Sequence, residues 1–210
     1  MESIDMAENI VELLTDVADA IREKKGSTEP INAQNFAEEI KSLPSSGDNG
    51  LADSLVMRTI TEYVNNEITE IGNYAFYGCT QLTTIVVNKV TKIGNLAVAN
   101  SSNLATLNAP SLERINTQAL RDNKLTHLDL PALVNIESYA FYGNKLLTTL
   151  ILRKGAVCGL ESTNALTNTP IANGTGYIYV PDDLVESYKS ATNWSTYASQ
   201  IKGLSELPQE

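Results

Sequence analysis

One phrase of about 22 residues occurs four times in this chain of 210 residues. The copies begin at Ile68, Val90, Leu112 and Leu133, and matching isoleucines are separated by 22, 22 and 21 residues. Five apolar columns stay in register through the four copies. They are Ile71, Ile93, Ile115, Ile136; Ala75, Ala97, Ala119, Ala140; Leu82, Leu104, Leu125, Leu147; Ile85, Leu107, Leu128, Leu150; and Val87, Ala109, Leu130, Leu152. Such self-similarity indicates a repeat architecture, in which each unit is stabilised by its neighbours.

Each copy contains a segment of alternating leucines, such as Leu125, Leu128 and Leu130. We predict a short strand here, with alternate side chains facing the interior. Strands of successive copies should lie side by side in a parallel sheet, about 4.8 Å apart. The stretch around NYAFYG returns the chain on the opposite side, and the alanine column marks its tightest packing. The predicted fold is an α/β repeat solenoid with short parallel strands.

The first 44 residues are expected to form a helical segment for anchoring or oligomerisation. Apolar residues of the first helix follow one another at intervals of three and four, as in a heptad pattern, and a second helix is predicted over 33–42. About two and a half heptads are too short for an autonomous coiled coil, which favours docking, although folding back on the second helix fits as well. The positions concerned are Ile4, Ala7, Val11, Leu14, Ala18 and Ile21.

Three further segments follow the helices. Residues 45–54 read as a linker, because SSGDNG is polar and contains glycine. Residues 55–180 are assigned to the repeats, with a degenerate opening copy and a degraded stretch from Gly155 to Gly174. Tyr177–Val180 is predicted to be the last strand. Residues 181–210 are predicted to form a helical cap, with short helices over 182–190 and 194–201 and with Tyr188, Trp194, Tyr197 and Ile201 covering the terminal apolar face.

Composition excludes several classes of function. The net charge of −10 argues against nucleic-acid binding, which selects for clustered lysine and arginine. No stretch approaches the roughly 18 apolar residues of a membrane span, so membrane insertion is not expected. The opening MESIDMAEN is acidic, and we therefore expect no secretory signal peptide.

The sequence offers little material for catalysis or for metal and cofactor binding. His127 is the one histidine, and Asp129 is its nearest candidate partner, but no nucleophile column accompanies them. Cys79 and Cys158 have no metal-binding spacing and are expected to be reduced and partly buried. We predict no catalytic residues, no metal site and no cofactor, hence no enzyme.

Two surfaces are candidates for binding. The first is the outer side of the predicted strands, where a merely solvated sheet face is the alternative. It comprises Thr84, Val86, Thr106, Asn108, His127, Asp129, Thr149, Ile151 and Arg153. The second is a set of tyrosines on the return side, for which packing between coils is the favoured interpretation. These are Tyr74, Tyr77, Tyr139 and Tyr142.

The pattern IxxIGxxAFxGCxxLxxIxV, read from residues 68–152, resembles the BspA-type leucine-rich repeat. Copies one and four match well, whereas Val98 and Leu120 replace the phenylalanine, and Asn100 and Asp122 replace the glycine, in copies two and three. The closing run GTGYIYVPDDLVESYKSATNWSTYASQI is similar to the ending of such proteins. The resemblance implies adhesion or protein binding and carries no catalytic residues.

The run DAIREKKGSTEPINAQNFAEEIKSL, within residues 17–43, resembles a segment of tail and other virion proteins of bacteriophages that infect Firmicutes. Together the two resemblances imply a non-enzymatic virion protein of the tail, baseplate or capsid fibre, located in the virion. Its helices would contact other virion proteins or a second copy of the chain, and its repeats would bind a host-surface glycan or protein. The alternative is a bacterial cell-surface adhesin or protein-interaction module.

Overall fold

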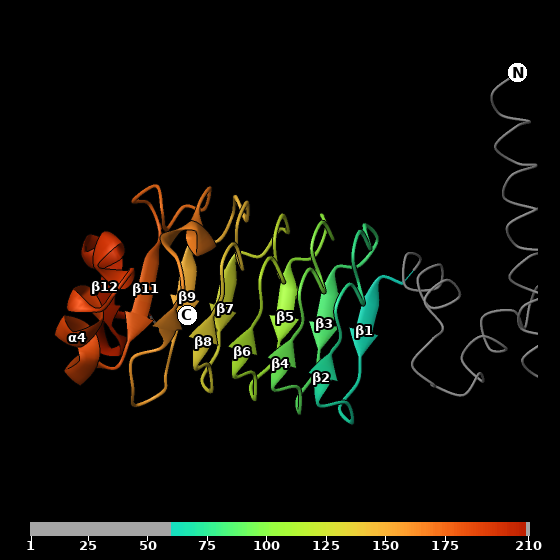
Figure 1. Cartoon of the computed structure of the whole chain (residues 1–210), viewed down its shortest axis with the longest axis horizontal. Coiled ribbons are helices and arrows are strands. Elements are labelled where there is room, and N and C mark those ends of the chain that lie inside the picture. Colours follow the sequence, from blue (N-terminus) through green and yellow to red (C-terminus); the bar gives the residue numbers. More distant parts are fainter. Residues whose placement is uncertain (1–59, 209–210) are drawn as a thin grey trace, which may run out of the picture. The chain divides into compact units, whose positions relative to one another are not determined.

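The computed structural model describes residues 60–208, all within one compact unit. The predicted helical segment, the linker and the start of the opening repeat lie outside the described residues. In the described part, each coil contains a longer strand, a tight turn, a two-residue strand and a return segment (Figure 1). No helix among residues 60–208 is long and apolar enough to cross a membrane.

The longer strands lie side by side and are parallel throughout, as predicted (Figure 1). Pairing joins matching positions, so that Ile85 faces Leu107 and Leu128 faces Leu150. The strands are β1 (Glu62–Val64), β3 (Thr84–Val86), β5 (Thr106–Asn108), β7 (His127–Asp129), β9 (Thr149–Ile151) and β11 (Tyr177–Val180), with β12 (Ile201–Gly203) at the end.

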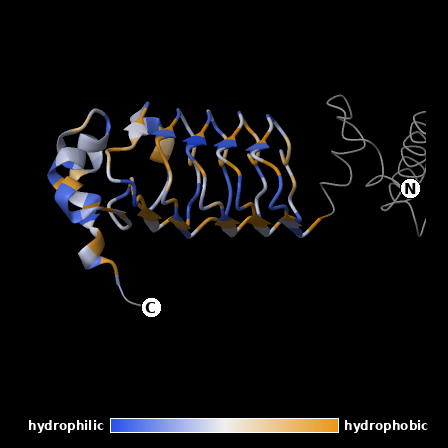
Figure 2. Cartoon of the chain, turned by 90° about the horizontal axis from the view of Figure 1, so that it is seen from below, coloured by the Kyte–Doolittle hydropathy of each residue, from blue (hydrophilic) through white to orange (hydrophobic). Residues whose placement is uncertain are grey.

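A second parallel sheet consists of the two-residue strands, which the sequence analysis did not predict. It lies across the interior from the longer strands, as the two rows of arrows in Figure 2 show. Its strands are β2 (Glu70–Ile71), β4 (Lys92–Ile93), β6 (Arg114–Ile115), β8 (Asn135–Ile136) and β10 (Gly159–Leu160). The second residue of each strand continues the isoleucine column, which therefore forms one wall of the core.

The five apolar columns fill the space between the sheets. All their members are buried except Ala75, which is exposed. Ala75 lies in the first described return segment, so no described segment covers its outer side. The predicted tight packing therefore holds for Ala97, Ala119 and Ala140 but not for the first position. Burial of the apolar columns is the main stabilising contribution, because no single coil can shelter its own inner face.

The sheet of longer strands is interrupted between β5 and β7, whereas the sheet of short strands is continuous. The third copy is one residue shorter than the others between Ile115 and Leu125. A coil that is one residue shorter cannot pair with the preceding coil in register in both sheets at once. The longer strands lose their pairing, and the bond from the Lys124 amide to the Leu104 carbonyl, at 2.8 Å, keeps the two coils adjacent.

One position of every return segment is a buried small or polar residue. The Ser101 hydroxyl donates to the carbonyl of Phe76 in the preceding coil at 2.7 Å. The Asn144 amide donates in the same way to the Leu120 carbonyl, also at 2.7 Å. Such side chains satisfy carbonyls that the core hides from water. The position is occupied by Cys79, Ser101, Asn123, Asn144 and Thr169.

Each return segment also contains residues with left-handed backbone. The position that precedes the buried polar residue has a φ between 54° and 75° in five coils. Glycine, asparagine and aspartate adopt this conformation most easily. Asn100 and Asp122 therefore fit where the repeat pattern has glycine, which explains the departures noted in copies two and three. The members are Gly78, Asn100, Asp122, Gly143 and Asn168.

The C-terminal part differs from its prediction in two respects. Tyr177–Val180 forms β11 but is not the last strand, because Ile201 pairs with Ile178 to begin β12. The segment predicted as a helix over 194–201 is a kinked 3-10 helix, η3 (Trp194–Gln200). The other helices are η1 (Thr163–Leu166), η2 (Asp182–Leu184), α4 (Val185–Ser190) and η4 (Leu204–Glu206).

Side chains of the C-terminal part form hydrogen bonds with backbone groups at the unpaired edge of β10. The Tyr188 hydroxyl accepts from the Cys158 amide at 2.9 Å, and the Trp194 indole donates to the Cys158 carbonyl at 2.6 Å. Asn193 donates to the Leu160 carbonyl at 2.8 Å. Both aromatic rings are buried and meet edge to face. These residues close the core with hydrogen bonds that a further strand would otherwise supply.

Candidate functional site

The strand face places most of the predicted binding residues on the outside, as alternation requires. Four of them are exposed and four are half-buried. Ile151 is the exception: its side chain is 1% exposed, so its assignment to the binding surface was wrong. Ile151 pairs with the buried Tyr179 of β11, and the C-terminal residues Leu207 and Pro208 come back to the same part of the sheet.

A hollow of about 370 Å³ lies where the C-terminal residues meet β7 and β9. The hollow contains five of the predicted binding residues and two residues that sequence reasoning missed. The lining is His127, Asp129, Thr149, Ile151, Arg153, Leu207 and Pro208.

An ion pair is the main polar feature of the hollow. Nε of Arg153 lies 2.9 Å from each carboxylate oxygen of Asp129, and Nη2 lies 2.7 Å from Oδ2. This bonding to Asp129 raises the pKa of Arg153, so the arginine stays charged. Asp129 is thus engaged by Arg153 and not by His127, the partner that the sequence analysis considered.

The return face carries the second candidate surface. Tyr74, Tyr77 and Tyr139 are 59%, 43% and 40% exposed, and Tyr142 is half-buried. The interpretation that these side chains pack between coils was therefore wrong for the first three. Two edge-to-face pairs form, Tyr74 with Tyr77 and Tyr139 with Tyr142, at centroid distances of 6.0 and 5.7 Å. The rings stand on the surface as ordered pairs.

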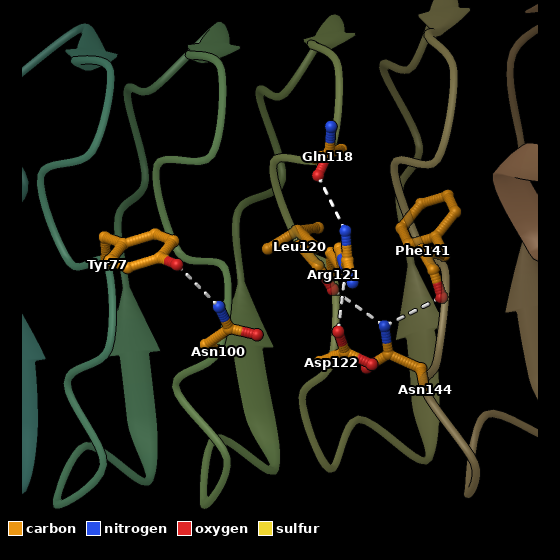
Figure 3. A network of polar contacts seen from close by, with 8 residues as sticks. All are labelled: Tyr77, Asn100, Gln118, Leu120, Arg121, Asp122, Phe141 and Asn144. Atoms are coloured by element: carbon orange, nitrogen blue, oxygen red, sulfur yellow. Dashed lines mark hydrogen bonds and ion pairs between the residues drawn. The ribbon is translucent and has the colours of Figure 1, made fainter.

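Separate polar contacts hold Tyr77 and Arg121 in neighbouring parts of the return face (Figure 3). Asn100 donates to the Tyr77 hydroxyl at 3.0 Å. In the next coil, the Arg121 guanidinium lies 5.0 Å from the centre of the Tyr142 ring and donates to Asp122 at 2.7 Å and to Gln118 at 2.9 Å. The bond to Asp122 raises the pKa of Arg121.

Sequence reasoning missed Arg121, although a signal was present. Arg121 occupies the same repeat position as Tyr77 and Tyr142. Residues at one repeat position form a row across the stack, so an arginine between two tyrosines marks a mixed aromatic and cationic row. We call this surface, made of Tyr74, Tyr77, Arg121, Tyr139 and Tyr142, the return-face row.

The described residues show no arrangement for metal binding or nucleophilic catalysis. No group of three or more His, Cys, Asp or Glu residues within 60–208 is placed to hold a metal ion. Cys79 and Cys158 are both buried, and burial raises the pKa of the Cys158 thiol to about 12. A protonated, buried thiol is a poor nucleophile.

Comparisons with solved structures give alignments that cover part of this chain. The pneumococcal vaccine antigen PcpA aligns over 69% of this chain and 40% of its own, with 17% identity and a TM-score of 0.45. A leucine-rich repeat protein from Bacteroides ovatus aligns over 57% of this chain and 52% of its own, with 18% identity and a TM-score of 0.28. The chain thus spans about half or less of the length of these proteins. No curated protein matches the sequence.

The comparison with models of protein families identifies the repeat. The BspA type leucine rich repeat region matches residues 52–171 in six copies, two more than the four read from the sequence. The match covers more than half of the chain, and the buried columns and parallel strands give its physical basis. The chain belongs to the BspA-type leucine-rich repeat family.

Proposed function

We propose that this chain is a non-enzymatic binding module whose return-face row docks a protein on a cell surface. Repeats of this family are typically binding modules and are often found at cell surfaces. The observation that carries the proposal is the exposure of Tyr74, Tyr77 and Tyr139, each in an edge-to-face tyrosine pair, together with the contact of Arg121 with the ring of Tyr142, the partner of Tyr139. Tyrosine and arginine dominate the energetics of protein interfaces, because both combine large contact area with hydrogen bonding.

The dimensions of the return-face row favour a protein over a small ligand. Tyr74 and Tyr139 are three coils apart, which corresponds to about 14 Å at the spacing of adjacent strands. The hydrogen bonds of Asn100, Gln118 and Asp122 hold Tyr77 and Arg121 in place before any partner arrives. Side chains ordered in advance lose less conformational entropy on binding.

The strand face offers little support for the enzymatic alternative. A glycan hydrolase needs two carboxylates facing each other across a cleft. Asp129 is the one acidic residue in the lining of the hollow, and its oxygens are bonded to Arg153. We therefore propose recognition without hydrolysis for the hollow as well.

Binding of the fluorescently labelled full chain to intact bacterial cells tests the return-face proposal. We expect Tyr74→Ser combined with Tyr139→Ser to lower the affinity at least about tenfold, since hot-spot truncations cost more than about 1.4 kcal/mol. Thr84→Ser combined with Thr106→Ser, on the strand face, is the matched control and should bind as the parent does. Protease treatment of the cells should abolish binding, whereas periodate oxidation of their glycans should not. Unchanged binding by the tyrosine variant contradicts the proposal.

We propose as a second candidate that the chain is a virion component. The support is the sequence of residues 17–43, which lies outside the described residues. In this proposal the repeats form an outward-facing solenoid, and the helical segment with Ile4, Val11 and Leu14 attaches to other virion proteins or to a second copy. The return-face row would then meet a host-surface protein.

Two measurements test this candidate. Mass spectrometry of particles purified from the encoding organism should find the chain, and its absence from the particles would refute a virion role. The solution mass of the full chain, compared with that of a chain starting at Ser45, tests the helical segment. Self-association should require the first 44 residues; two monomers would refute the oligomeric form of the proposal.

A further inference from the structure

We propose that the hollow beside β9 binds a single unit of a neutral sugar. This site is separate from the return-face row and does not depend on the protein-docking proposal. The hollow, of about 370 Å³, is at the small end of the range for ligand pockets. It therefore suits one sugar unit better than a folded epitope.

The charges of the hollow point to a neutral ligand. Asp129 and Arg153 form a closed ion pair with three short contacts, so the pair carries no net charge. A ligand carboxylate would find its arginine already neutralised and would approach a like-charged aspartate. Hydroxyl groups meet no such repulsion, because each can accept from the guanidinium or donate to the carboxylate.

Unused hydrogen-bonding groups remain around the ion pair. The contacts of Arg153 with Asp129 engage Nε and Nη2, which leaves the N–H groups of Nη1 available. Neither the His127 ring nor the Thr149 hydroxyl has a hydrogen-bond partner among the described residues. These donors and acceptors come from adjacent strands, β7 and β9, and can therefore meet several hydroxyls of one ring.

The same hollow has an apolar side. Ile151 forms the buried floor of the hollow, and Leu207 and Pro208 supply aliphatic surface from the C-terminal segment. A sugar ring presents C–H groups on its faces and hydroxyls around its rim, and this amphipathic shape matches the lining.

Titration of the ¹⁵N-labelled full chain, followed by NMR, tests the proposal with matched ligands. D-glucose, D-galactose and N-acetyl-D-glucosamine are the neutral probes, and D-glucuronate and D-galacturonate are the charged counterparts of the first two. We expect at least one neutral sugar to shift the amide peaks of β7, β9 and Leu207 saturably, and to bind more tightly than the uronates. Shifts that do not saturate, that spread over the whole molecule, or that favour a uronate overturn the proposal.

Two near-isosteric variants complete the test. Thr149→Val removes the hydroxyl inside the hollow and should weaken sugar binding about threefold to tenfold, as expected for one lost hydrogen bond. Thr106→Val makes the same change on β5, outside the hollow, and should leave binding unchanged. Thermal unfolding confirms that both variants fold. Equal affinities for the two variants would assign the binding to another surface and contradict the proposal.

Discussion

Asn123 and Asn144 occupy the same position in consecutive coils, yet only Asn144 has hydrogen-bond partners among the described residues. The Asn144 amide donates to Leu120 and Phe141, at 2.7 and 2.9 Å, although its Oδ1 is unpaired. Neither side-chain polar atom of Asn123 is paired, and this residue is 5% exposed. Asn123 lies in the shortened third copy, where the ladder between β5 and β7 is lost.

The two asparagines should respond differently to removal of the amide. Asn144→Ala leaves the buried Leu120 carbonyl without a donor, whereas the Phe141 carbonyl still accepts from the backbone amide of residue 144, and the change should lower the free energy of unfolding by about 2 kcal/mol. Asn123→Ala removes a desolvated group that gains nothing from folding, and the change should stay within about 0.5 kcal/mol. Urea unfolding of both variants measures the difference. Equal destabilisation would mean that Asn123 is hydrogen-bonded in solution, for example by water.

Gly143 and Gly78 form a second matched pair. Both have left-handed backbone, with φ of 75° and 69°. A Cβ at Gly143 would collide with the Asp122 carboxylate, which Arg121 holds in place, whereas a Cβ at Gly78 meets no atom within 4 Å. Gly78→Ala should cost about 1 kcal/mol for the backbone alone. Gly143→Ala should lower the free energy of unfolding by about 1–3 kcal/mol more than Gly78→Ala does. Urea unfolding of both variants measures the difference. Equal losses in the two variants would contradict the described contact between residue 143 and Asp122.

Stability should fall in alkaline solution because two buried acids keep their protons when folded. Burial raises the pKa of Cys158 from 9.0 to about 12 and that of Tyr188 from 10.0 to about 12. Above pH 9 the unfolded chain therefore binds fewer protons than the folded chain, and unfolding becomes more favourable as the pH rises. The contribution of the protonated Cys158 and Tyr188 to the free energy of unfolding is complete below pH 9 and is lost as the pH rises toward 12.

Thermal unfolding at a series of pH values between 8 and about 11 measures this dependence. In Cys158→Ala the decline should begin closer to pH 10, where Tyr188 titrates in the unfolded chain; burial raises the pKa of Tyr197 in the same direction. A midpoint that stays constant from pH 8 to about 11 would show that neither group is buried as described.

The periodic part of the fold could be predicted because its cause is local and repeated. Ile85, Leu107 and Leu128 recur at nearly constant intervals, and burial of each requires the strand alternation that was read from the sequence. The sheet of short strands was missed because two residues, such as Lys92 and Ile93, are too few to show alternation. Strand β12 was missed because its sequence, Ile201-Lys202-Gly203, does not repeat the leucine pattern of the earlier strands, although it pairs with β11.

The surfaces were harder to predict than the core. Alternation places Ile151 outside, and only the return of Leu207 to the same strands shows that the site is covered. The tyrosines of YAFYG were read as packing residues, because a signature of a repeat is usually structural. Left-handed backbone at Tyr74 and Tyr139 places those two side chains on the outside instead, and single-sequence patterns do not reveal backbone angles.

Photo-crosslinking from the return-face row tests the central claim most directly. A benzophenone amino acid replaces Tyr77 in one version of the full chain and Thr106, on the strand face, in the other. Both versions are applied to intact cells and irradiated, and the products are identified by mass spectrometry. The proposal predicts one defined protein joined to position 77 and not to position 106, with the product lost when Tyr74→Ser and Tyr139→Ser are added. The same protein joined only at position 106, or a product at 77 that survives both tyrosine changes, would contradict it.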